Sequence, residues 1–235
     1  NPSSKYDAEG QTGIINIVLK KNQKIGINGS VALTAGNRDN YNANTNLSFR
    51  NSKINLYGNY NFRNGNRVGG GFSNTTYTNS SGIVNNNSDF KRQNVNNSVK
   101  LGADYYLNDK ATLGVSGNFN FRDNEGQEHL NYLYQNIPTG DGTSFRTTDS
   151  EEDDAGYDLS LDFSNKFKRK GEELTANFSF GQDTEDGAQY FDQIFFNSDG
   201  TPKDSVDRRI NNNSEFTNSY NIQVDYILPL NTKQK

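Results

Sequence analysis

Residues able to do chemistry are few in this sequence, and carboxylates dominate them. One acidic run holds Asp149, Glu151, Glu152, Asp153 and Asp154. Carboxylate oxygens are the ligands that calcium and similar hard cations prefer. The spacing matches no EF-hand loop, so the run predicts only a weak cation site with Glu151, Asp153 and Asp154 as candidate ligands. A solvated loop is the competing interpretation.

Acid–base and zinc chemistry lack the partners that they need. The single histidine, His129, lies in a polar stretch beside Glu125 and Glu128, and we expect it to be an exposed loop residue. No second histidine and no cysteine is present to complete a zinc site. Residues 69–71 are three glycines without a following lysine–serine or lysine–threonine pair, so we expect a loop hinge and not a phosphate-binding loop. The sequence therefore predicts no enzyme, no cofactor and no metal site beyond the weak candidates in the acidic run.

Three long polar stretches are the remaining candidates for binding. They cover residues 64–94, 123–156 and 182–215, and we expect all three to be loops. Aromatic rings among asparagine, serine and glycine suit sugars or chelate complexes, because rings offer stacking faces and amides offer donors. The candidate ligand-binding residues are Tyr77, Phe90, Tyr132, Tyr134, Tyr190, Phe191 and Phe195. Packing of the loops on one another is the alternative role for these rings.

The elements that must position these loops are strands, because apolar and polar residues alternate along the chain with a period of two. In residues 41–50, for example, Tyr41, Ala43, Leu47 and Phe49 alternate with asparagine and serine. About eight segments of roughly ten residues show this pattern, which is the length of a tilted membrane-spanning strand. They lie at residues 25–35, 41–50, 54–62, 99–107, 113–121, 157–167, 174–180 and 220–228.

Two features indicate that the apolar side of these strands faces lipid. The connections alternate between short turns, such as residues 51–53, and the long polar stretches, as in outer-membrane barrels. Aromatic residues also stand at both ends of the apolar side, where rings suit the boundary between lipid and water. The sequence therefore predicts an all-β fold, a transmembrane antiparallel β-barrel in the outer membrane of a Gram-negative bacterium. In such a barrel we expect an arginine at Leu101 to be costly and a serine at Gly102, on the polar side, to be mild.

Composition excludes several other classes of protein. Hydrophobic residues make up 31% of the chain and the mean hydropathy is -0.96, but aromatic residues reach 12% and the net charge is only -4. A disordered chain has few aromatic residues and a high net charge, so disorder is not predicted. No run of eighteen apolar residues is present, so no helical membrane span is expected. The low pI of about 5.1, with dispersed basic residues, predicts no nucleic-acid partner.

The first 21 residues carry an ordered set of short motifs. They are Tyr6, Ala8-Glu9-Gly10, Gly13-Ile14-Ile15-Asn16-Ile17 and Lys20-Lys21. This stretch resembles the closing segment of the plug domain of TonB-dependent outer-membrane receptors. The resemblance implies that residues 1–22 end a plug domain and that residues 23–235 begin a barrel of 22 strands. It also implies import of an iron-siderophore or another large nutrient such as cobalamin or a glycan.

The same resemblance implies a TonB-type energy-coupling protein as partner, which would act through a coupling box and a plug body that this sequence does not contain. We expect an open portion of a larger barrel, because small polar residues would fill the narrow lumen of an eight-stranded barrel only loosely. Two alternatives remain open. One is a small closed outer-membrane barrel acting as an adhesin or structural anchor, and the other is a soluble all-β binding protein.

Overall fold

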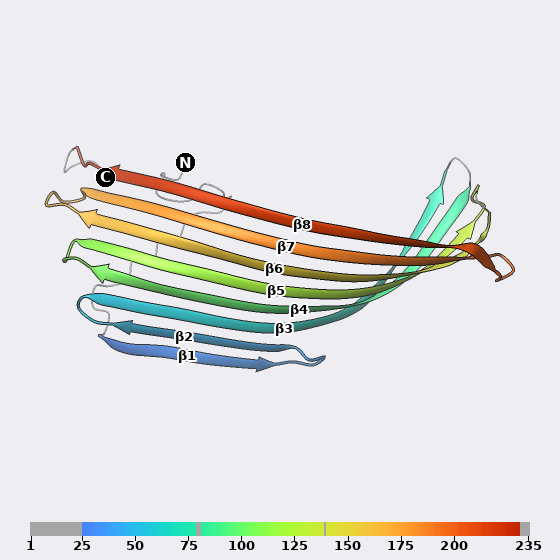
Figure 1. Ribbon diagram of the computed structural model, residues 1–235, viewed down its shortest axis with the longest axis horizontal. Helices are drawn as coiled ribbons and strands as arrows, with labels where there is room; N and C mark the ends of the chain where they lie inside the picture. The colour runs from blue at the N-terminus through green and yellow to red at the C-terminus, as the bar shows by residue number, and fades with distance from the viewer. Residues whose placement is uncertain (1–24, 79–80, 139, 231–235) are drawn as a thin grey trace.

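A computed structural model describes residues 25–78, 81–138 and 140–230, so the predicted plug segment at residues 1–22 lies outside the described residues. Within those ranges the chain forms one eight-stranded antiparallel sheet and no helix (Figure 1). No helix in this part of the chain is therefore long and apolar enough to cross a membrane. The strands are β1 (Gly26–Ala35), β2 (Tyr41–Arg50), β3 (Ile54–Tyr77), β4 (Gly82–Tyr106), β5 (Ala111–Gln135), β6 (Gly142–Lys166), β7 (Glu173–Asn197) and β8 (Pro202–Ile227).

The strands follow one another in chain order, so each is joined to the next by a hairpin. All eight segments predicted as strands are confirmed. Short turns at one end of the sheet use a repeated device: the side-chain oxygen of Asn51 accepts from the amides of Lys53 and Ile54, both at 2.8 Å. Asn108 accepts in the same way from the amides of Lys110 and Ala111. Such asparagine turns satisfy the amides at the point where a strand begins.

The prediction of three long loops is wrong, because strands continue through all three polar stretches. Pairing of β3 with β4 extends from Ile54↔Tyr105 to Tyr77↔Gly82, and the predicted glycine hinge at residues 69–71 pairs with residues 88–90. The backbone ladder continues where side chains on both faces become polar. Apolar and polar residues alternate along a strand only where its two faces meet different solvents. The alternation therefore ends at the membrane surface, whereas the strand continues beyond it.

Strand length shows how far the sheet extends beyond a bilayer. Strands β3 to β8 contain 24 to 26 residues each. At about 3.3 Å per residue they are roughly 80 Å long, whereas about ten residues cross the apolar layer. Strands β1 and β2 have only 10 residues each and stop far short of the others (Figure 1). The long hairpins therefore project well beyond the membrane, while the β1–β2 hairpin does not.

We name the two sides of the sheet the apolar face and the polar face. One row of paired residues crosses all eight strands on the apolar face: Ile27, Phe49, Leu56, Ala103, Val115, Leu161, Phe178 and Ile222. Its members are solvent-accessible, with Val115 at 55% and Ile222 at 75% exposure. Only Ala111 and Leu130 are buried apolar residues in the described chain. The sheet is a single layer whose apolar face has no protein core to pack on, as expected for a wall whose solvent is lipid.

Aromatic residues bound the apolar face at two levels, as predicted. Toward the long hairpins, Tyr157 contacts Phe119 and Phe180, and Phe180 contacts Tyr220, with ring centroids 5.0 to 6.5 Å apart. Toward the short turns, Phe167 meets Tyr226 edge-on at 6.1 Å. Rings at these two levels suit the two boundaries between lipid and water.

The polar face is joined by amides and carboxylates across the strands. Asn59 donates to Asn46, and Asn55 donates to Asp104, each at 2.8 Å. A serine at Gly102, which the sequence predicts to be mild, would bring its β-carbon into the outer end of the Tyr57 ring, so the tyrosine would have to shift. Strands β1 and β8 are not paired with each other in the described chain, so the sheet is an open, curved wall.

Candidate ligand-binding surface

Six of the seven candidate ligand-binding residues share the polar face of the long hairpins. Strand register places Tyr77, Phe90, Tyr132, Tyr134, Phe191 and Phe195 there, in line with the amide-rich wall below. Tyr190 lies on the opposite face of β7. In an extended strand neighbouring side chains point to opposite sides, so Tyr190 and Phe191 cannot line the same surface.

Arg146 on β6 is the centre of this surface. Its guanidinium carbon lies 5.8 Å from the ring centroid of Tyr132 on β5 and 5.8 Å from that of Phe191 on β7. A guanidinium within about 6 Å of a ring is held by the ring's negative face. The buried Nε of Arg146 has no hydrogen-bond partner among the described residues. Three adjacent strands thus hold a cation between two rings, and we call these residues the arginine–aromatic cluster.

A small hydrogen-bonded group fixes the end of the cluster nearest the hairpin tips. Ser144 is 2% exposed and shares a hydrogen bond with the hydroxyl of Tyr134 at 3.0 Å. Gln193 donates to the same serine oxygen at 2.8 Å. The rings of Tyr132 and Tyr134 lie parallel, with centroids 5.9 Å apart. Both tyrosines are therefore held by contacts on neighbouring strands.

A second arginine–ring group lies beside the first on the polar face. Phe90 on β4 has Arg92 at 4.9 Å and Arg67 of β3 at 5.6 Å from its ring centroid. Together with Arg146, three guanidinium groups and several rings lie beyond the aromatic belt on this face. Sequence reasoning found the rings but missed all three arginines, because it searched for residues that react and gave no weight to cations that bind.

The predicted acidic ligands do not form one group. Glu151 and Asp153 lie on the side of the sheet that carries the apolar face, whereas Glu152 and Asp154 lie on the polar face. There, Glu152 and Asp154 come together with Glu185 of β7, with ligand atoms within 4.8 Å of one another.

Arg122 partly neutralises the group formed by Glu152, Asp154 and Glu185. It contacts Asp154 directly and lies 3.7 Å from Glu152. Asn124 adds a hydrogen bond to Glu152 at 2.8 Å. The rule that residues two apart share a face would have selected Glu152 and Asp154, had the stretch been recognised as a strand.

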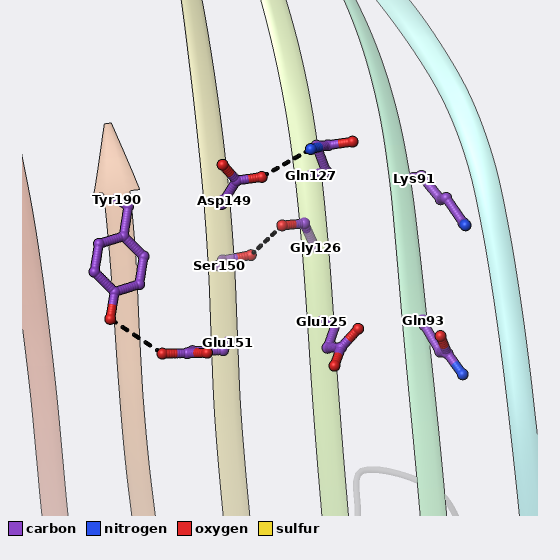
Figure 2. Close-up of a pocket in the computed structure, with 9 residues that line it drawn as sticks. All are labelled: Lys91, Gln93, Glu125, Gly126, Gln127, Asp149, Ser150, Glu151 and Tyr190. Carbon is purple, nitrogen blue, oxygen red and sulfur yellow. Dashed lines mark hydrogen bonds between the residues drawn. The ribbon is translucent and has the colours of Figure 1, made fainter. Parts of the chain in front are cut away.

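A hollow of about 350 Å³ lies on the other side of the sheet, beyond the aromatic belt (Figure 2). Tyr190 donates to a carboxylate oxygen of Glu151 at 3.1 Å, and Gln127 donates to Asp149 at 3.0 Å. The hydrogen bond to Glu151 raises the pKa of Tyr190, because the carboxylate favours the protonated phenol. Figure 2 shows these side chains together with Lys91, and they come from β4, β5, β6 and β7.

The prediction that His129 is an exposed loop residue is wrong. His129 belongs to β5 and stacks on Phe145 of β6, with ring centroids 5.7 Å apart. Its Nδ1 is buried and has no hydrogen-bond partner in the described ranges. The contact with Phe145 gives the residue a packing role.

Comparison with known proteins agrees with this architecture. Residues 165–235, which include β7 and β8, match the model of a family described as "Outer membrane protein beta-barrel family". No curated protein matches the chain. The antiparallel sheet, its uncovered apolar face and this match place the chain in the outer membrane of a Gram-negative bacterium, with membrane lipid against the apolar face.

Proposed function

We propose that the chain is part of a TonB-dependent outer-membrane receptor that imports an iron-siderophore. The observation that carries the proposal is the position of Arg146 between Tyr132 and Phe191 on the polar face. A cation flanked by rings suits an anionic chelate with flat, electron-rich groups, because such a ligand offers both charge and stacking area. The resemblance of residues 1–22 to the end of a plug domain supports the same assignment.

The dimensions of the wall support a wide barrel. An eight-stranded barrel has an interior that side chains fill, and it would have to pair β1 with β8. Strand β1 offers 10 residues to the 26 of β8, so most of β8 would remain unpaired in such a closed barrel. The small polar residues of the polar face also suit the wall of a hydrated lumen. These features favour a receptor over the small closed adhesin or anchor.

Transport in this proposal involves binding and release without covalent chemistry. The arginine–aromatic cluster captures the chelate beyond the membrane, and the amide-lined wall below offers a polar route past the plug. A TonB-type partner would supply the energy by acting on the plug. Cobalamin and glycans offer less negative charge to three arginines, so they fit the cluster less well.

The test is uptake of radioactive iron chelates by cells that carry the intact receptor. Deleting the receptor gene should abolish uptake of one anionic chelate, and the wild-type gene should restore it. Arg146→Ala should restore uptake poorly, while Arg122→Ala, on the same face but paired with carboxylates, should restore it well. Uptake that persists after collapse of the proton-motive force would contradict the proposal.

A further inference from the structure

Residues 67–77 of β3 form an open strand edge, because the neighbouring strand β2 ends before it reaches them. Strand β2 pairs with β3 only as far as Tyr41↔Asn64, whereas β3 pairs with β4 as far as Tyr77↔Gly82. No described residue forms a strand beside residues 67–77 on the other side of β3. At about 3.3 Å per residue this edge is roughly 35 Å long. An edge of that length is a template for another strand.

At the start of this edge, an asparagine side chain makes the two backbone hydrogen bonds that a neighbouring strand would make. Asn40, in the turn between β1 and β2, donates its side-chain amide to the backbone oxygen of Asn66 at 3.1 Å. Its side-chain oxygen accepts from the backbone amide of Asn66 at 2.8 Å. Asn66 therefore directs both of its backbone groups toward the open side.

Backbone direction alternates along an antiparallel strand, so the next residues of the same parity also point to the open side. They are Val68, Gly70, Phe72, Asn74 and Thr76, and each presents an amide hydrogen and a carbonyl oxygen there. Odd-numbered residues direct the same groups toward β4. In the described chain, five residues of this edge thus offer unpaired backbone donors and acceptors to another strand, and they lie beyond the membrane.

The edge carries none of the features that usually block strand addition. Proteins protect edges with proline, bulges or inward-pointing charges. Residues 68–77 contain no proline and no charged residue, and residues 69–71 are three glycines. The pairing of β3 with β4 is regular throughout. Phe72 is 78% exposed on the apolar-face side, and so offers a large side chain to a partner.

The foot of the edge is rich in positive charge. A hollow of about 500 Å³ is lined there by Arg38, Val68 and Lys91, with Asp89 as its one carboxylate. Arg67 and Arg92 lie close by on the polar face around Phe90. A strand that carries carboxylates would match these cations, since complementary charge favours specific association.

We propose that residues 68–76 of β3 are a docking edge for an extended, acidic strand of another polypeptide. That strand pairs with β3 on the side opposite to β4. The inference is independent of the proposed import function. A strand that belongs to the same barrel beyond β1 would have to reach across the width of two strands, about 10 Å, to pair here. A separate chain outside the cell meets this edge without that reach, and it is the occupant of this proposal.

The test uses the intact protein and a defined probe, a ten-residue fluorescent peptide of alternating threonine and valine with glutamates. Binding is measured by fluorescence anisotropy. The protein should bind this peptide and should not bind the same peptide methylated on every backbone nitrogen, because methylation removes the donors of the ladder. A lysine-substituted peptide should bind more weakly.

Matched substitutions at Asn74 isolate the edge. Asn74→Pro removes an amide that points to the open side without breaking a bond to β4, and should weaken peptide binding about tenfold or more. Asn74→Ala also removes the side chain but keeps the amide, and should bind like the wild type. Unchanged melting temperature of both variants shows that the hairpin is intact.

Three results would overturn the proposal. One is equal binding of the methylated and unmethylated peptides, or no binding of either. Another is binding that survives Asn74→Pro. The third is a dimer of the protein in native membranes that Asn74→Pro dissociates, because the occupant would then be a second copy of the same chain.

Discussion

The ring of Tyr57 fills the space beside Gly102, its directly paired residue on β4. A β-carbon on Gly102 would overlap the end of the tyrosine ring. An aromatic ring lying over a glycine of the next strand protects the backbone that the glycine leaves bare. This pair explains why a glycine stands in the middle of a spanning strand, where it would otherwise weaken the sheet.

Serine at Gly102 should therefore destabilise the protein. We expect Gly102→Ser to lower the free energy of unfolding by about 1 to 3 kcal/mol, because the ring of Tyr57 must leave its position. Gly71→Ser is the matched control on the same face, since a β-carbon there meets only the hydroxyl of Ser88 at 3.7 Å. Thermal unfolding in detergent measures both. Equal losses would show that the Tyr57 ring moves aside freely.

Charge on the apolar face should be costly at the level of Leu101. This side chain is 57% exposed and belongs to the face that meets lipid. We expect Leu101→Arg to cost about 2 to 4 kcal/mol if the residue lies near the bilayer midplane. Ser98→Arg puts the same charge on the polar face of the same strand and should cost far less. Urea unfolding of the protein in lipid vesicles compares the two variants, and a reversed order would exchange the two faces.

Two tyrosines on opposite faces separate ligand binding from general surface effects. Tyr132 lies in the arginine–aromatic cluster, whereas Tyr190 lies on the other side of the sheet. Under the proposed function, we expect Tyr132→Leu to weaken binding of an iron chelate about tenfold, through loss of stacking and of the contact with Arg146. Tyr190→Leu should leave the affinity unchanged. Intrinsic fluorescence quenching by the chelate measures both, and a larger loss for Tyr190→Leu would move the site to the other face.

The phenol of Tyr190 should titrate at higher pH than an ordinary tyrosine. Its hydrogen bond to Glu151 raises its pKa in the folded protein above the usual value of about 10. A raised folded pKa adds stability that is complete below the unfolded pKa and is lost as pH rises through the folded pKa. The phenolic carbon signal in ¹³C-tyrosine NMR follows the titration. Glu151→Gln should lower the pKa of Tyr190, and an unchanged pKa would mean that the hydrogen bond is absent in solution.

The sequence predicted the spanning part of the fold well, for a clear physical reason. In the spanning strands, residues such as Val115 and Leu161 face lipid, while the residues next to them in the chain face water. This difference produces the alternation of apolar and polar residues. Beyond the aromatic belt both faces are wet, so nothing in the order of residues 182–215 separates a long hairpin from a loop. Pairing there depends on partners on β6 and β8, which only the register supplies.

The candidate surface was predictable only in part. Aromatic residues in polar stretches indicated Tyr132 and Phe191, but their shared contact with Arg146 depends on the register of β5, β6 and β7. In the acidic run, the weak candidates Glu151, Asp153 and Asp154 were selected as members of a loop, where the face of each side chain could not be assigned. In a strand, Glu151 and Glu152 face opposite sides. The third carboxylate beside Glu152 and Asp154 is that of Glu185, about thirty residues away on β7.

The orientation of the wall tests the account most directly, and a chain without cysteine makes the measurement simple. Single substitutions Pro138→Cys and Ser198→Cys lie in turns at the ends of long hairpins, and Ser52→Cys and Asp109→Cys lie in short turns. In the intact protein on whole cells, a membrane-impermeant maleimide should label the first two and should reach the other two only after lysis. Labelling of Ser52→Cys on intact cells, with Pro138→Cys protected, would invert the wall and place the arginine–aromatic cluster in the periplasm.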